Sequence, residues 1–257
     1  MDYLVVCGVA LVASGLTLFS GFGLGTLLLP AFLLFFPPDL AVGMTAVVHF
    51  VNNLFKLTLF VRKADPAIVV KFGVPAVLAS FAGAWVLLSI SQSEPLFSYE
   101  FLNRHATVTP LKILMAVLIM SFAFFESLPA NKSVQLESRW LPLGGLLSGF
   151  FGGLSGHQGA LRSVFLLHLN LSKEVFIGTG VVVACFVDAT RVTVYGRHFV
   201  SAGIQENVLL VVVASLSAIG GVLLARKVSE GVTMQSIQRI VAVLLFVIAI
   251  GLGIGIV

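Results

Sequence analysis

The amino-acid sequence predicts an all-α integral membrane protein. We expect two inverted repeats of about five membrane segments each, with short glycine-broken helices meeting near the midplane. Three observations lead to this prediction. The 257 residues are 58% hydrophobic and only 10% charged, whereas soluble domains carry roughly 25% charged residues. Several nearly uncharged runs have about the 20 residues that are needed to cross a hydrocarbon core. The two halves of the chain also match each other.

The apolar runs are predicted to be helices. In lipid only a helix or a closed barrel satisfies its own backbone, and these runs lack the period-2 alternation of barrel strands. The clearest runs span residues 67–90, 111–125, 208–225 and 240–257. The amino-terminal run has no positively charged start, so we expect a first helix there and not a cleaved signal peptide. Cys7 and Cys185 both lie in apolar runs, which indicates packing and not a disulfide or a metal site.

An internal repeat organises the chain. A shift of 135 positions aligns residues 20–66 with residues 155–201 without a gap. The aligned pairs include Gly21 with Gly156, Asp39 with Glu174, Gly43 with Gly178, Asn53 with Asp188, Lys56 with Arg191, and Arg62 with Arg197. We therefore divide the chain into a first repeat (1–127), a cytoplasmic linker (128–139) and a second repeat (140–257).

Each repeat is predicted to contain the same elements in the same order. A helix (3–19 or 140–154) is followed by a glycine-rich break, a short apolar segment (24–36 or 159–171) and a long helix (41–61 or 176–196). Two further helices complete each half. Short or glycine-interrupted segments at matching positions of two halves are typical of the central site of a transporter.

The distribution of Lys and Arg predicts the topology. If each short segment brings the chain back across the membrane, nine of these residues lie on one side and three on the other. If the short segments do not, the same residues divide six and six. Because positive charge gathers on the cytoplasmic side, the first arrangement is favoured. It gives five segments per half, both termini outside and halves of opposite orientation, and it holds equally for re-entrant hairpins. We expect a multi-pass protein of the bacterial inner (plasma) membrane.

The two glycine-rich breaks are the candidate site. Inverted repeats bring such breaks together near the midplane. The short helices that begin near Leu24 and Gly159 would direct positive N-terminal ends at a ligand, which favours an anion. The candidate substrate-binding residues are Gly21, Gly23, Gly25, Thr26, Thr45, Asn52, Asn53, Gly156, His157, Gln158, Arg162, Thr179, Asp188 and Arg191.

Three residues in and just after the second break are the most informative. An unpaired Arg162 near the bilayer centre would cost about 2.5–3.5 kcal/mol, so such a residue is usually functional. The alternatives are snorkelling to an interface or a structural pair with Asp188. His157 and Gln158 offer neutral donors that could orient ligand oxygens, or they could form a helix-capping pair without a ligand.

The long helices carry further polar residues. Asp188 and Arg191 are three positions apart, so they share a face and can neutralise each other; we interpret this pair as mainly structural. Four polar residues of the first long helix are expected to face the bundle interior: His49, Asn52, Asn53 and Lys56. Thr45 and Thr179 could contact a ligand oxygen or their own helix backbone. No cofactor is expected, although His157 or His49 could carry a coupled proton.

Two other functions are weighed. A transporter of a neutral or cationic solute would use Asp188 as its carboxylate contact. An intramembrane serine hydrolase is suggested by the GLSG sequence ending at Gly156, which matches the GxSG around the serine of rhomboid-type proteases. That mechanism needs a histidine base on a later membrane helix, and no histidine after Ser155 lies in the middle of a predicted helix. An enzyme is therefore not expected.

Three stretches resemble the sulfite exporter TauE/SafE family of multi-pass transporters: GFGLGTLLLP, AVGMTAVVHFVNN and EVFIGTGVVV. The resemblance covers nearly the whole chain. It implies a secondary transporter for a small anion such as sulfite, a sulfonate or a related organic acid, working by alternating access. The chain departs from the family at GHQG (156–159), where many members have three glycines. The implied partners are a small anionic substrate and the lipid bilayer, with no nucleic acid; a homodimer is kept open.

Overall fold

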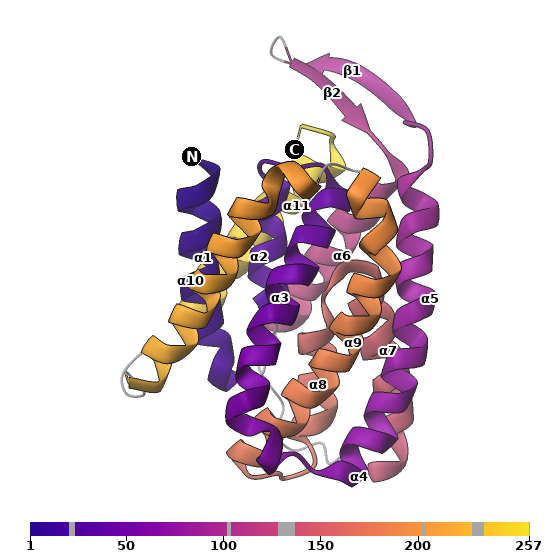
Figure 1. Cartoon of the computed structure of the whole chain (residues 1–257). Coiled ribbons are helices and arrows are strands. Elements are labelled where there is room, and N and C mark those ends of the chain that lie inside the picture. Colours follow the sequence, from indigo (N-terminus) through magenta and orange to yellow (C-terminus); the bar gives the residue numbers. More distant parts are fainter. Residues whose placement is uncertain (21–23, 102–103, 128–136, 202–203, 228–233, 257) are drawn as a thin grey trace.

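The computed structural model describes residues 1–20, 24–101, 104–127, 137–201, 204–227 and 234–256. It is a bundle of helices (Figure 1). The first half contains α1 (Asp2–Ser20), α2 (Leu24–Leu33), α3 (Pro38–Phe60), η1 (Val61–Lys63), α4 (Pro66–Ile68), η2 (Val69–Gly73), α5 (Val74–Ser91) and α6 (Pro110–Ser127). The second half contains η3 (Ser138–Trp140), α7 (Leu141–Ser155), α8 (Gln158–Leu167), α9 (Lys173–Ser201), η4 (Ile204–Asn207), α10 (Val208–Lys227) and α11 (Met234–Gly253).

The predicted all-α membrane class is confirmed. By length and composition, four helical stretches of the described chain can cross a membrane: Pro38–Lys63, Pro66–Ser91, Lys173–Gly196 and Gln205–Ala225. One element was not predicted, an antiparallel hairpin of β1 (Phe97–Phe101) and β2 (Arg104–Val108). Tyr99 Oη donates to the Ile254 carbonyl at 2.5 Å, so the hairpin is bonded to the chain just after α11.

Both glycine-rich breaks are followed by short helices, as predicted. Gly156 ends α7 in a left-handed conformation with φ +88° and donates its N–H to the Gly152 carbonyl at 2.9 Å. A glycine is favoured there because a Cβ would be strained at positive φ. The helix ends differ from the predicted ones by a few residues: α8 ends at Leu167 instead of residue 171, and α2 at Leu33 instead of residue 36.

The chain runs back and forth between two ends of the bundle. One end carries both termini and the hairpin, and the other carries α4 (Figure 1); we call them the terminal end and the α4 end. At the α4 end, Lys63 of η1 forms an ion pair of 2.7 Å with Glu174 at the start of α9. The end of α3 therefore lies beside the start of α9, and these two long helices run in opposite directions.

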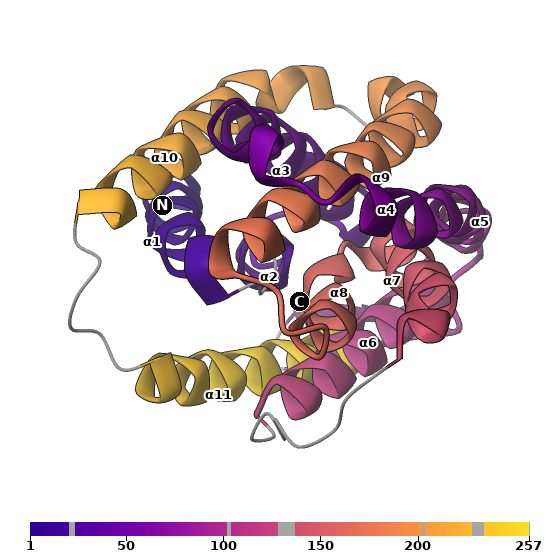
Figure 2. The same ribbon diagram turned by 90° about the horizontal axis from the view of Figure 1, so that it is seen from below.

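The helices pack mainly between halves. Helix α1 packs against α10, α3 against α9, α5 against α7 and α6 against α11. The short helices α2 and α8 lie in the middle (Figure 2). Glycines bring α7 very close to η2 and α5. A Cβ on Gly145 would collide with the Phe72 carbonyl of η2, and a Cβ on Gly149 or Gly153 with the Ala76 or Ser80 carbonyl of α5. Small residues spaced by four are a common device for close helix packing in membranes.

Candidate functional site

The site is built on one face of α3. His49, Asn52, Asn53 and Lys56 occur at helical spacing and are all buried, with exposed fractions of 6% or less. Polar side chains inside membrane helices normally face the protein interior, because lipid offers them no partner. Here His49 and Asn53 contact α9, against which α3 packs, and Asn52 is bonded to Ser14 of α1.

Asp188 of α9 is the centre of a hydrogen-bonded network. Its Oδ2 lies 2.6 Å from His49 Nδ1 and accepts from Asn53 Nδ2 at 2.8 Å. Its Oδ1 accepts from Gln158 Nε2 at 2.8 Å and from Arg191 Nη1 at 3.2 Å. Asp188 is fully buried, and a buried carboxylate is tolerated only when it is paired and hydrogen-bonded in this way.

The second short helix joins this network to Arg162. Gln158, the first residue of α8, accepts at Oε1 from Arg162 Nη1 at 3.4 Å. Its backbone carbonyl accepts from Ser148 Oγ at 2.9 Å, which fixes the start of α8 against α7. Arg162 follows Gln158 by four residues and lies on the second turn of α8.

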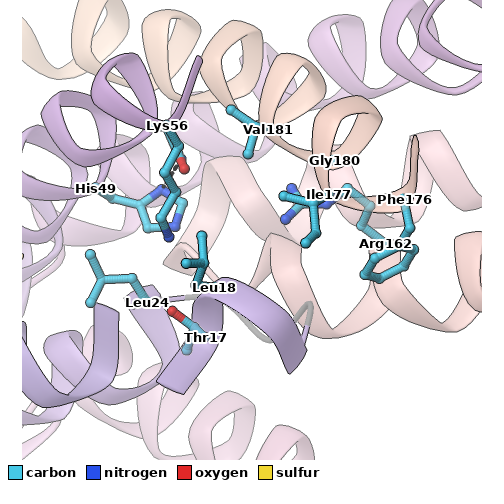
Figure 3. Close-up of a pocket in the computed structure, with 11 residues that line it drawn as sticks. Thr17, Leu18, Leu24, His49, Lys56, Arg162, Phe176, Ile177, Gly180 and Val181 are labelled. Carbon is cyan, nitrogen blue, oxygen red and sulfur yellow. Dashed lines mark hydrogen bonds between the residues drawn. The ribbon is translucent and has the colours of Figure 1, made fainter. Parts of the chain in front are cut away.

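A pocket opens beside the network. It is lined by Thr17, Leu18, Leu24, His49, Asn53, Lys56, Arg162, Phe176, Ile177, Gly180 and Val181, with a volume of about 460 Å³ including its open mouth. Figure 3 shows His49 and Lys56 entering it from α3 and Arg162 entering it from α8. Gly180 leaves room for the arginine, because a Cβ there would lie 3.2 Å from Arg162 Nε.

The pocket holds two cations without a carboxylate partner among the described residues. Lys56 is 6% exposed and Arg162 9% exposed, yet the structure pairs neither with an Asp or Glu. The buried Lys, Arg, Asp and Glu residues of the described chain are Lys56, Arg162, Arg191 and Asp188, so the buried Lys and Arg residues exceed the carboxylates by two. Unpaired buried charge is costly, so this pocket is suited to an anion.

A comparison with known protein families identifies the family of the chain. The family model described as "Sulfite exporter TauE/SafE" matches residues 6–252 of the chain. The chain belongs to the sulfite exporter TauE/SafE family. As the match spans nearly the whole chain, the protein is a membrane-embedded member of a transporter family. No curated protein matches this TauE/SafE member significantly.

Not all predicted residues reach the pocket of this TauE/SafE member. His157 is fully buried; its ring stacks on Phe122 at 4.8 Å between centroids, and its Nδ1 lies 3.0 Å from Ser155 Oγ. Thr179 accepts a hydrogen bond from the Asp65 backbone N–H at 2.9 Å. These two side chains therefore contact the helix framework and do not line the pocket.

The first break reaches the centre through Gly25. A Cβ on this residue would lie 3.0 Å from the Gly156 carbonyl, so the starts of α2 and α8 meet as predicted. Thr26 and Thr45 are buried, and their hydroxyls have no hydrogen-bond partner among the described residues. Asn52 accepts from Ser14 Oγ at 3.1 Å. Gly21 and Gly23 lie outside the described residues.

The Asp188–Arg191 pair was predicted, and the structure shows it as an ion pair of 3.2 Å. Lys56, by contrast, was expected to face the bundle interior as the repeat partner of Arg191, but it was not among the candidate substrate-binding residues. A signal for it existed, since Lys56 is a charged residue in the middle of the apolar run 41–61. Its direction toward the pocket depends on the rotation of α3, which the sequence pattern did not give.

One contact in the structure bears on the serine hydrolase alternative. The 3.0 Å contact between Ser155 Oγ and His157 Nδ1 is the contact that a nucleophile and its base require. Both residues are fully buried, neither lines the pocket, and Ser155 Oγ also donates to the Phe151 carbonyl at 3.1 Å. This dyad therefore has no described route to a substrate.

Proposed function

We propose that this TauE/SafE family member carries a small oxyanion across the bacterial plasma membrane as a multi-pass secondary transporter, with Lys56 and Arg162 as its anion contacts. The observation that carries the proposal is the pair of buried cations that face one pocket without a carboxylate partner in the described chain. Charge-assisted hydrogen bonds from ammonium and guanidinium groups to an oxyanion are strong. An anion in the pocket would also relieve the repulsion between the two cations.

The net charge of the buried groups favours a doubly charged substrate. Among the described residues, the three buried cations Lys56, Arg162 and Arg191 exceed the one buried carboxylate, Asp188, by two charges. A divalent oxyanion such as sulfite neutralises this excess without a coupled proton, whereas a monovalent sulfonate leaves one positive charge in a region where charge is costly. We therefore place sulfite before sulfonates, and uncoupled transport before proton coupling through His49.

A neutral or cationic solute is less well supported. Its carboxylate contact would be Asp188, but both oxygens of that residue already accept hydrogen bonds from protein donors. Asp188 is fully buried and does not line the pocket. A cation would also approach Lys56 and Arg162, which repel it.

The test is transport by purified protein in liposomes. Solid-supported-membrane currents and sulfite flux would be measured for the wild type, Arg162→Ala and Lys56→Met, with sulfate, taurine and simple carboxylates as competitors. Lys71→Met serves as the matched control because Lys71 is an exposed basic residue in η2. Thermal unfolding in detergent checks that each variant folds.

We expect both pocket variants to lose transport while they remain folded, and Lys71→Met to transport normally. Loss of a buried unpaired cation removes a desolvation cost, so the unfolding midpoint of Lys56→Met should not fall. Normal sulfite transport by folded Arg162→Ala or Lys56→Met would overturn the proposal.

A further inference from the structure

The guanidinium of Arg162 has one edge without a protein partner. Among the described residues it donates to Gln158, whose Oε1 accepts from Nη1 at 3.4 Å. No described residue accepts a hydrogen bond from its Nε or Nη2. These two nitrogens carry the parallel N–H bonds with which an arginine binds two oxygens of one anion. The free edge is therefore the one that suits an oxyanion.

Gln158 holds the opposite part of the guanidinium from inside the protein. It is 0% exposed and does not line the pocket. Its Nε2 donates to Asp188 Oδ1 at 2.8 Å, and its backbone carbonyl accepts from Ser148 Oγ at 2.9 Å. Because the amide is fixed by these bonds, its Oε1 stays directed at Nη1 of Arg162. The Nε–Nη2 edge is left for a ligand.

Gly180 of α9 lies beside the Arg162 side chain, on the N–H side of Nε (Figure 3). A Cβ on this glycine would lie 3.2 Å from Nε but 3.8 and 3.9 Å from Cζ and Cδ, the two carbons bonded to that nitrogen. An oxygen that accepts from Nε would sit about 2.9 Å from it on the same side. The Cβ of any other residue would therefore occupy part of the space that this oxygen needs.

Helix α9 itself does not require a glycine at position 180. The helix continues from Lys173 to Ser201, and Gly180 has no positive φ. Inside a helix, alanine is favoured over glycine. The three nearest atoms to a Cβ on Gly180 all belong to Arg162, whereas a Cβ on Gly149 would collide with the backbone of Ala76. Gly180 therefore serves the arginine and not the packing of two helices.

We propose that Arg162 binds two oxygens of one anion through Nε and Nη2, and that Gly180 determines this specificity by keeping the edge open. The inference rests on the proposed function, because it assigns how Arg162 contacts the transported anion. Lys56 enters the same pocket from α3 and would meet a further oxygen. The pocket would then favour anions with several oxygens on one atom, such as sulfite, over a halide, which offers a single point of contact.

The experiment measures sulfite binding by the purified full-length protein. The dissociation constant is obtained from the rise of the unfolding midpoint with sulfite in detergent, and KM from sulfite flux in liposomes. The variants are Gly180→Ala, Arg162→Lys and the double variant. Arg162→Lys keeps the charge but has no two-point edge. Gly196→Ala is the matched control, because it adds a Cβ to the same helix with no atom within 4 Å.

We expect Gly180→Ala to weaken sulfite binding about tenfold, as for the loss of one hydrogen bond to a charged group. Its unfolding midpoint without sulfite should not fall, since alanine favours the helix. Arg162→Lys should weaken binding by a similar factor. In that background Gly180→Ala should change the dissociation constant by less than about twofold, because the edge that it blocks is already absent. Gly196→Ala should bind sulfite as the wild type does.

Three results would overturn the two-point contact. The first is a dissociation constant for Gly180→Ala within about twofold of the wild type. The second is a double variant in which the two losses multiply, since Gly180 would then act independently of Arg162. The third is normal sulfite binding by Arg162→Lys, which would show that the charge alone suffices.

These outcomes are distinct from failure of the proposed function. If Arg162→Ala loses transport while Arg162→Lys binds sulfite normally, the anion pocket stands and only the two-point contact is removed. Normal transport by Arg162→Ala, or no sulfite-dependent rise of the midpoint in the wild type, would remove the proposed function and this inference with it.

Discussion

Asn53 Nδ2 donates to Asp188 Oδ2 at 2.8 Å, and the two residues are 135 positions apart, which is the shift that aligns the two halves of the chain. Equivalent positions of α3 and α9 therefore meet each other where the helices pack together. His49, Gln158 and Arg191 complete the contacts of the same carboxylate. Both oxygens of the Asp188 carboxylate are thus hydrogen-bonded at the centre of the molecule, and the unpaired cations lie beside it in the pocket.

Replacement of Asp188 by Asn should strongly destabilise the protein. The variant keeps the shape of the side chain but leaves Arg191 without its ion pair, and breaking a buried pair costs about 3–5 kcal/mol. Thermal unfolding in detergent measures the effect. Glu174→Gln is the matched control, because Glu174 forms only an exposed ion pair with Lys63, and its midpoint should stay nearly unchanged. Equal midpoints for the two variants would show that Asp188 is not the centre of the network.

Replacing Thr45 or Thr179 by valine should change the stability of the protein in opposite directions. Thr45→Val removes a buried hydroxyl without a partner, so we expect unfolding to become harder by about 1 kcal/mol. Thr179→Val removes the acceptor of the Asp65 N–H, so we expect unfolding to become easier by a similar amount. Paired chemical denaturation curves measure both, and a destabilised Thr45→Val would argue that its hydroxyl has a partner in this conformation.

The close glycine contacts between α5 and α7 predict that the effect of a Gly→Ala substitution on stability depends strongly on its position. Gly149→Ala should lower stability or prevent folding, because the new Cβ would collide with the backbone of Ala76. Gly220→Ala should be neutral or stabilising by up to about 1 kcal/mol, since no atom lies within 4 Å of a Cβ there and alanine favours a helix over glycine. Yield and thermal midpoint after solubilisation test this pair, and similar behaviour of both variants would contradict the packing.

A fluorophosphonate probe should not label Ser155 in the folded protein. The residue is fully buried and lies away from the pocket, so the reagent cannot reach Oγ even though His157 is in contact with it. In-gel detection with Ser155→Ala as the control gives the measurement. Labelling that disappears in Ser155→Ala would revive the hydrolase alternative.

Much of the fold could be predicted from the sequence because the relevant signals are local. The length of an apolar run sets whether a helix can cross a membrane, and the glycine at position 156 marks where α7 must end. The shift of 135 positions likewise identified Asn53 and Asp188 as equivalent residues. The hairpin at 97–108 was missed because it lies outside the apolar runs on which the prediction depended.

The sequence by itself determined the membrane class, the order of the helices, the two breaks and the presence of buried charge. Only the tertiary structure decided which charges face open space. His157 follows the second break and was expected at the ligand, but its ring stacks on Phe122, whereas Lys56 from a different half reaches the pocket. The physical reason is that the direction of a side chain depends on how its helix is rotated, and that rotation is set by contacts between segments far apart in the chain, such as α3 with α9.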